Sequence, residues 1–127
     1  MVRRVLRKDG VVAVQAGPAD PMNHEIFARV CRTMGAVFDG FKPLISYVPS
    51  FNDQWGFVVG FKGNSSLGPP EEVNARLEDR MESRPDFFDG ETLIRIASLS
   101  LEFRRNLKKP LEPFTDADPP RMKEGTR

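Results

Sequence analysis

The sequence predicts an α/β fold in which about three strands form a mixed sheet covered by helices. A continuous apolar run, Val11–Val14, is typical of a strand that is buried on both faces, as in α/β sheets. Two aromatic-rich segments, 42–48 and 55–62, are joined by a polar loop, which favours an antiparallel pair. Apolar residues at helical spacing flank these strands, so helices are expected to cover the sheet.

Length and composition exclude several classes of protein. The chain has 127 residues, enough for one domain or less, and its 19 basic and 18 acidic residues leave no strong net field to attract nucleic acid or a membrane surface. The single cysteine, Cys31, excludes an internal disulfide and fits a reducing compartment. No apolar run approaches the ~18 residues of a membrane span, and no signal peptide is apparent. We therefore expect a cytoplasmic protein with no nucleic-acid or membrane partner.

The first forty residues read as helix, strand and helix. Residues 1–8 have the apolar face and basic last turn of a helix C-terminus, which hints that the start of this helix is missing. The strand ends at Gly17-Pro18, and Asp20 or Asn23 can begin the next helix. The apolar stripe of that helix consists of Phe27, Val30, Cys31, Met34 and Phe38.

The C-terminal half predicts a loop, two helices and a tail. Residues 63–68 have the composition of a loop, and a helix begins at Pro69-Pro70. One last amphipathic helix is expected through Ile96, Leu99, Phe103 and Leu107. The alternation of apolar and polar residues at 99–101 is also compatible with a strand, which is the alternative there. Residues 110–127 hold several prolines and many charges, and we expect a disordered tail.

Gln15 is a candidate binding residue because it stands at the C-terminal end of an apolar strand. Ligands of open α/β sheets bind beyond such strand ends. Its amide oxygen can accept a hydrogen bond from an amine. The alternative is that Gln15 only satisfies the backbone of the following loop.

Phe51 and Trp55 are candidates because large aromatics in loops often serve binding. Their rings can attract an alkylammonium ligand by about 0.5–2 kcal/mol per cation–π contact. Trp55 can equally be the first buried residue of the next strand. Asp53 is best interpreted as turn chemistry. The lone His24 has no cysteine nearby to complete a zinc site, so no metal site and no catalytic residue are assigned.

Two motifs, one after the other along the chain, resemble the C-terminal portion of the polyamine aminopropyltransferases, the spermidine and thermospermine synthases. They are residues 15–19 (Gln-Ala-Gly-Pro-Ala) with the His-Glu-x-Phe helix start, and residues 49–56 (Pro-Ser-Phe-Asn-Asp-Gln-Trp-Gly). Spermidine synthases usually carry Pro-Thr-Tyr-Pro-Ser-Gly at the second motif, so the chain is more similar to thermospermine synthases there. The resemblance continues through the helix from Glu71 and the segment 89–92, and covers about residues 1–109.

This resemblance implies that residues 1–109 form the C-terminal half of a methyltransferase-like Rossmann fold. The family transfers an aminopropyl group from its co-substrate, decarboxylated S-adenosylmethionine, to a polyamine. The matching positions imply that Gln15 contacts the acceptor amine and that Phe51 and Trp55 line its channel. Phe51 in place of tyrosine fits a longer acceptor such as spermidine. The family's Gly-rich nucleoside loop and Asp-x-x-Asp-Pro segment do not occur in this chain, so we expect it to be inactive alone, with no tightly bound cofactor.

A non-catalytic role is the alternative: the chain could bind polyamine as a regulator or complement a separate N-terminal half. In either case the strand at Val11–Val14 would lie at a sheet edge without its usual neighbour. We therefore expect a homo-oligomer or aggregation-prone chain, or a partner that supplies the missing half.

Overall fold

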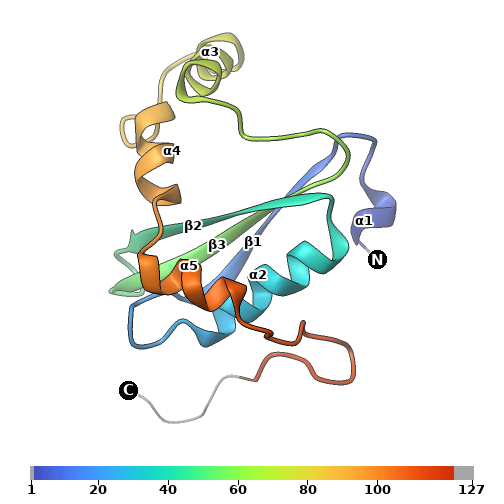
Figure 1. Cartoon of the computed structure of the whole chain (residues 1–127). Helices are drawn as coiled ribbons and strands as arrows, with labels where there is room; N and C mark the ends of the chain where they lie inside the picture. Colours follow the sequence, from blue (N-terminus) through green and yellow to red (C-terminus); the bar gives the residue numbers. More distant parts are fainter. Residues whose placement is uncertain (1, 122–127) are drawn as a thin grey trace.

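Three strands form one sheet in the computed structural model, which describes residues 2–121 (Figure 1). The elements along the chain are α1 (Val2–Val5), β1 (Val11–Pro18), α2 (Glu25–Val37), β2 (Gly40–Val48), β3 (Asp53–Phe61), α3 (Pro70–Arg80), α4 (Gly90–Ala97) and α5 (Leu101–Lys108). The strand order is β1–β3–β2. This confirms the α/β class and the edge position of β1, and it places β3 at the centre of the sheet.

Both strand pairings are antiparallel within the described residues. The sheet is therefore antiparallel, whereas the sequence predicted a mixed sheet. β2 and β3 form a hairpin whose connecting loop is residues 49–52, and a connection this short requires antiparallel strands. β1 and β2 run in the same direction, but each pairs with β3 rather than with the other. Parallel pairing would need a further strand beside β1.

Helix α2 covers one face of the sheet and contacts all three strands. Two glycines of β3 make this close packing feasible. A Cβ at Gly56 would lie 2.5 Å from the Phe27 ring, and a Cβ at Gly60 would lie 2.6 Å from Met34 Cε. Phe27 is fully buried, and its ring stacks on Phe103 of α5 at a centroid distance of 4.7 Å. The predicted apolar stripe of α2 therefore forms the main core.

Helices α3 and α4 lie on the other side of the sheet, as Figure 1 shows. Val59 and Phe61 of β3 are buried there, opposite the alternate residues that meet α2. α4 contacts both β2 and α3, and Gly90 at its start lies against the Pro70 backbone, where an added Cβ would come within 2.3 Å of the Pro70 carbonyl oxygen. The chain thus has two unequal layers of helices around a small sheet.

The single last helix that the periodicity predicted is two helices, and no strand forms at 99–101. Each helix has its own N-cap: the Asp89 carboxylate accepts a hydrogen bond from Thr92 N at 2.7 Å, and Ser100 Oγ accepts one from Phe103 N at 3.1 Å. The hydrogen bond from Thr92 lowers the pKa of Asp89 from its ordinary value. Helix α4 ends with Ser98 as its C-cap residue, and Ser100 is the N-cap residue of α5.

The segment that follows α5 packs along α2, which differs from the disorder predicted for residues 110–127. Arg29 forms an ion pair with Asp118 at 2.8 Å, and its guanidinium lies 3.9 Å from the centroid of the Phe114 ring. Phe114 N also donates to Thr33 Oγ1 at 2.8 Å. These long-range contacts are invisible to composition, and residues 122–127 lie outside the described part of the chain.

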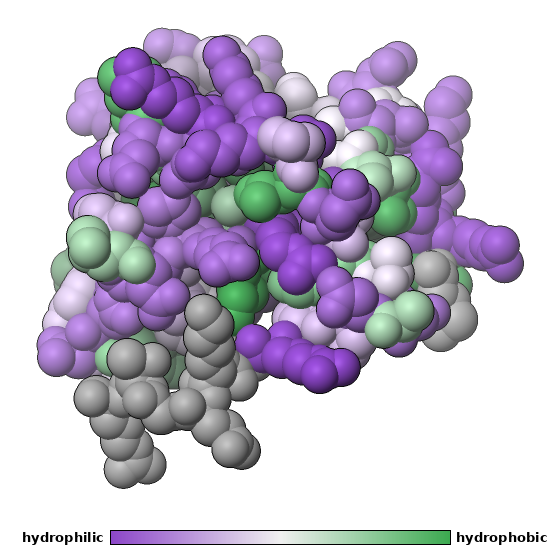
Figure 2. All heavy atoms as spheres, turned by 60° about the horizontal axis from the view of Figure 1, so that its bottom comes forward, coloured by the Kyte–Doolittle hydropathy of each residue, from purple (hydrophilic) through white to green (hydrophobic). Residues whose placement is uncertain are grey.

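Surface and core separate as the amphipathic patterns predict. Figure 2 shows the face that carries the C-terminal segment, where hydrophilic side chains dominate and apolar ones form small patches between them. Cys31 is buried on the inner stripe of α2, and burial raises the pKa of its thiol to about 12. A thiol in this environment is a core residue rather than a nucleophile.

The outer edge of β1 has no strand partner in residues 2–121. Val11 and Ala13 are exposed along this strand. An unpaired edge with apolar side chains is a template for pairing with another chain.

Replacing Ala13 with lysine is expected to reduce self-association of the chain, because a charge on an edge strand opposes strand pairing. Sedimentation velocity over a range of concentrations measures the change. Ala75→Lys is the control, since Ala75 is an exposed alanine on α3 and gains the same charge away from the edge. A wild-type chain that stays monomeric at all concentrations would contradict the expectation.

Candidate functional site

Gln15 lies on β1 immediately before an irregularity in the sheet. It is exposed and pairs with Phe57 of β3, and the register then shifts between Gln15 and Gly17. Gly17 takes a positive φ of 93°, a conformation that favours glycine, and Pro18 pairs with Trp55. Such a bulge re-aims the neighbouring side chains at the end of a strand.

Phe51 and Trp55 are in direct contact at the β2–β3 hairpin. Their ring centroids are 4.6 Å apart with an interplanar angle of 51°, and Phe51 remains 47% exposed. Trp55 is half-buried in β3, and its Nε1 is buried without a hydrogen-bond partner among the described residues. An unpaired donor of this kind costs about 1–3 kcal/mol. Trp55 is therefore both a strand residue, as the alternative held, and part of an aromatic pair.

Gln15 and Trp55 share one face of the sheet, and Phe51 of the adjoining loop contacts Trp55. Residues directly opposite in register face the same side, so Gln15 shares a face with Phe57. Trp55 lies two residues from Phe57 on the same strand and therefore on that face too. Diagonal neighbours of this kind are about 7–8 Å apart between Cα atoms. The fold thus places the Gln15 amide on the same face as the Trp55 ring, although the two residues are more than thirty residues apart in sequence.

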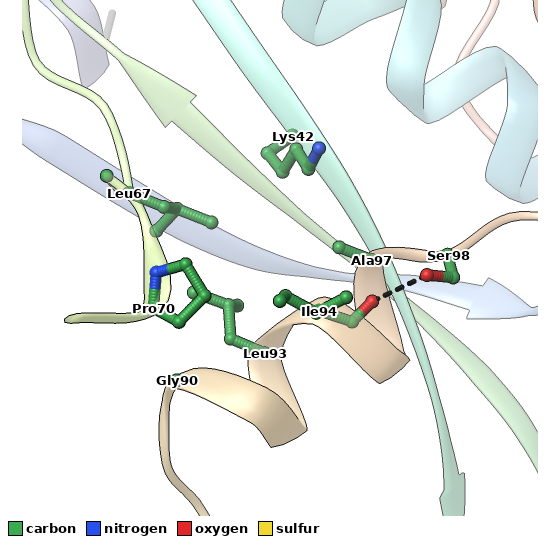
Figure 3. A pocket seen from close by; sticks show the side chains of 9 residues that line it. Lys42, Leu67, Pro70, Gly90, Leu93, Ile94, Ala97 and Ser98 are labelled. Atoms are coloured by element: carbon green, nitrogen blue, oxygen red, sulfur yellow. Dashed lines mark hydrogen bonds between the residues drawn. The ribbon is translucent and has the colours of Figure 1, made fainter. Parts of the chain in front are cut away.

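Two hollows in the described part of the chain are lined by other residues. One, of about 210 Å³, lies between β2, the loop before α3 and helix α4, and Figure 3 shows that most of its lining side chains are apolar, with Lys42 of β2 the one charged residue among them. The other, of about 510 Å³, lies beside the start of α2 and the end of α5. The His-Glu-x-Phe motif supplies His24 and Glu25 to the wall of the larger hollow, but the sequence did not indicate either hollow because their walls come from segments far apart in the chain.

His24 lines the larger hollow and is held by two contacts. Asn106 Nδ2 lies 2.7 Å from His24 Nε2, and His24 Nδ1 lies 3.1 Å from the Asp20 carbonyl oxygen. Both contacts fix the ring between α5 and the turn that precedes α2. His24 is thus partly buried and makes a tertiary contact between α5 and the start of α2.

The remaining polar candidates serve local structure. Asp53 Oδ1 accepts a hydrogen bond from Gln54 N at 2.7 Å, which supports the turn interpretation. In residues 2–121 no group of three or more His, Cys, Asp or Glu side chains could hold a metal ion. None of the helices in that range is long and apolar enough to cross a membrane.

The curated relatives of this chain share one enzyme family, although no protein-family model matches it. Thermospermine synthase ACAULIS5 of Arabidopsis thaliana is 34% identical over 112 residues, which cover 87% of this chain and 33% of that protein. The polyamine aminopropyltransferase of Korarchaeum cryptofilum is 30% identical over 128 residues, which cover 98% of this chain and 39% of that protein. The chain is a relative of the polyamine aminopropyltransferases. It spans well under half the length of these relatives, which is consistent with the predicted C-terminal portion.

Solved structures confirm the fold of this aminopropyltransferase relative. Spermidine synthase from Thermotoga maritima matches with a TM-score of 0.61 at 19% identity, covering 80% of this chain and 35% of that chain. A spermidine synthase in complex with the transition-state analogue AdoDATO matches with a TM-score of 0.61 at 18% identity, covering 80% of this chain and 34% of that chain. At these identities the likeness concerns the fold, and the roles of Gln15, Phe51 and Trp55 stay predictions.

Proposed function

We propose that this chain forms the acceptor-amine part of a polyamine aminopropyltransferase of the thermospermine or spermidine synthase type. The observation that carries the proposal is the Phe51–Trp55 ring pair, together with the position of Gln15 on the same face of the sheet as Trp55. The kinship with polyamine aminopropyltransferases supports the substrate class.

The chemistry of a polyamine suits these three side chains. A polyamine carries ammonium groups along an alkyl chain, and the faces of Phe51 and Trp55 attract such groups while contacting the methylenes. The Gln15 amide oxygen accepts an N–H bond from the amine that is to react. These residues would hold and orient the acceptor, so that the loss of its translational and rotational entropy occurs on binding rather than in the reaction step.

The reaction itself needs groups outside this chain. The acceptor nitrogen forms a bond to the aminopropyl carbon of decarboxylated S-adenosylmethionine, the carbon–sulfur bond breaks, and the amine proton passes to a base. The nucleoside loop and the aspartate segment that serve these steps in the family do not occur here. We therefore propose that the chain is inactive alone and binds no cofactor tightly.

A second function, a subunit that complements a separate N-terminal half, is supported by the outer edge of β1, which pairs with no strand among residues 2–121. In this role the chain would still supply the acceptor residues, and the partner would add strands beside β1. Product formation only after mixing the chain with such a half would distinguish this role.

Titration with spermidine is expected to produce a saturable change in the fluorescence of Trp55, the only tryptophan, with a Kd of about 1 mM or below. The change is expected because the ammonium groups would lie against the ring. A diol of the same length is the matched control, since it fills the same channel without the charge. No saturable change with millimolar spermidine would contradict the proposal.

A further inference from the structure

We propose that Tyr47 and Asn52 form a clamp that positions Phe51 against Trp55, and so set the acceptor affinity of the site. Tyr47 Oη donates to Asn52 Oδ1 at 2.6 Å across the β2–β3 hairpin. The inference rests on the proposed function for its effect on binding, but the clamp itself is tested independently of any ligand.

The backbone of the hairpin loop is already folded into two overlapping turns. Phe51 N donates to the Val48 carbonyl at 3.0 Å, and Asn52 N donates to the Pro49 carbonyl at 3.1 Å. Asn52 closes this loop with a positive φ of 51°, a conformation that asparagine tolerates better than most residues. The side chain of Asn52 is then free to accept a hydrogen bond from Tyr47.

The hydrogen bond between Tyr47 and Asn52 lies on the face of the hairpin opposite the Phe51–Trp55 pair. Tyr47 pairs with Gln54 in the β2–β3 register, whereas Ser46 pairs with Trp55. Because side chains alternate along a strand, Tyr47 and Trp55 lie on opposite faces of the hairpin. Asn52 is therefore held on one face while its neighbour Phe51 contacts Trp55 on the other.

The hydrogen bond between Tyr47 and Asn52 does not serve the packing of the core. Tyr47 is 51% exposed and Asn52 is also exposed, so the pair contributes little to the core. What the bond restricts is the loop that carries Phe51, whose own ring is half exposed. Without it the loop samples more conformations, and ordering them again on binding opposes affinity.

The test compares Tyr47→Phe, which removes only the hydroxyl of the chain's single tyrosine, with the wild-type chain. Three quantities are measured: the proton NMR shifts of the Trp55 indole, the Kd for spermidine, and the midpoint of thermal unfolding. The indole shifts should move toward those of Phe51→Ala, which defines complete loss of the ring contact. The Kd should rise about two- to tenfold, the factor for ordering one side chain, with little change in the unfolding midpoint.

Two substitutions of Asn52 serve as matched variants. Asn52→Asp retains an acceptor oxygen and should preserve both the indole shifts and the Kd. Asn52→Gly retains the positive φ but removes the acceptor, and should behave like Tyr47→Phe.

The outcomes separate the clamp from the proposed function. Indole shifts that stay unchanged in Tyr47→Phe would overturn the clamp, whatever the ligand does. If the shifts move but wild-type chain shows no saturable spermidine binding, the proposed function falls and the role of the clamp in affinity falls with it. Shifts that move with an unchanged Kd would also overturn that role.

Discussion

Phe27→Ala is expected to lower the free energy of unfolding by about 3–5 kcal/mol, as is usual for a buried phenylalanine. Phe27 is fully buried, stacks on Phe103, and fills the space above Gly56 that a Cβ would otherwise occupy. Domains of this size are stable by only about 5–15 kcal/mol, so this single change should remove a large fraction of the total. Its effect is large because one ring joins α2, β3 and α5.

Urea unfolding followed by circular dichroism measures the loss. Phe87→Ala is the matched control: the same chemical change at a residue that is 91% exposed should alter stability by no more than about 0.5 kcal/mol. If Phe27→Ala does not fold at all, Phe27→Leu should show an intermediate loss. Equal effects of Phe27→Ala and Phe87→Ala would refute the packing described here.

Gln15→Ala is expected to weaken spermidine binding by about tenfold or more. A hydrogen bond to a charged group is worth about 1.5–3 kcal/mol, and the exposed position of Gln15 places the effect at the lower end of that range. The stability of the fold should not change, because the Gln15 side chain makes no hydrogen bond to any of residues 2–121. The Trp55 fluorescence titration measures the change in Kd.

Gln54→Ala is the control for Gln15→Ala. Gln54 is also an exposed strand glutamine, but it pairs with Tyr47 and so faces the opposite side of the hairpin. We expect its Kd to stay within about twofold of wild type, a difference below the usual value of one hydrogen bond. Equal loss in both variants would mean that Gln15 is not a specific ligand residue.

Most of the fold could be predicted from the sequence because its signals are local. The run at Val11–Val14 and the stripe through Phe27 and Cys31 mark buried elements, and the polar loop at 49–52 marks the turn between two strands. The split of the last helix was missed because Ile96 and Leu107 stay in phase across the break, while the cap at Ser100 is a weak local signal.

The candidate site was predicted only in part. Gln15, Phe51 and Trp55 were selected one at a time by residue type and by resemblance, and the contact between the two rings follows from the hairpin. The sequence did not indicate Tyr47 as a site residue, because an aromatic residue in a strand usually packs in the core. Its hydrogen bond to Asn52 depends on a positive φ that the dipeptide Asn52-Asp53 merely permits.

The sequence by itself determined the three strands, the helices at α2 and α3, which face of α2 is apolar, and that β2 and β3 are antiparallel. These follow from periodicity and from a short loop, which act within one element or between neighbours. Only the tertiary structure decided that Gln15 and Trp55 share a face, that a bulge follows Gln15, and that residues 111–118 pack on α2. Such relations depend on the register between distant segments, which is set by the packing of the whole chain rather than by any local pattern.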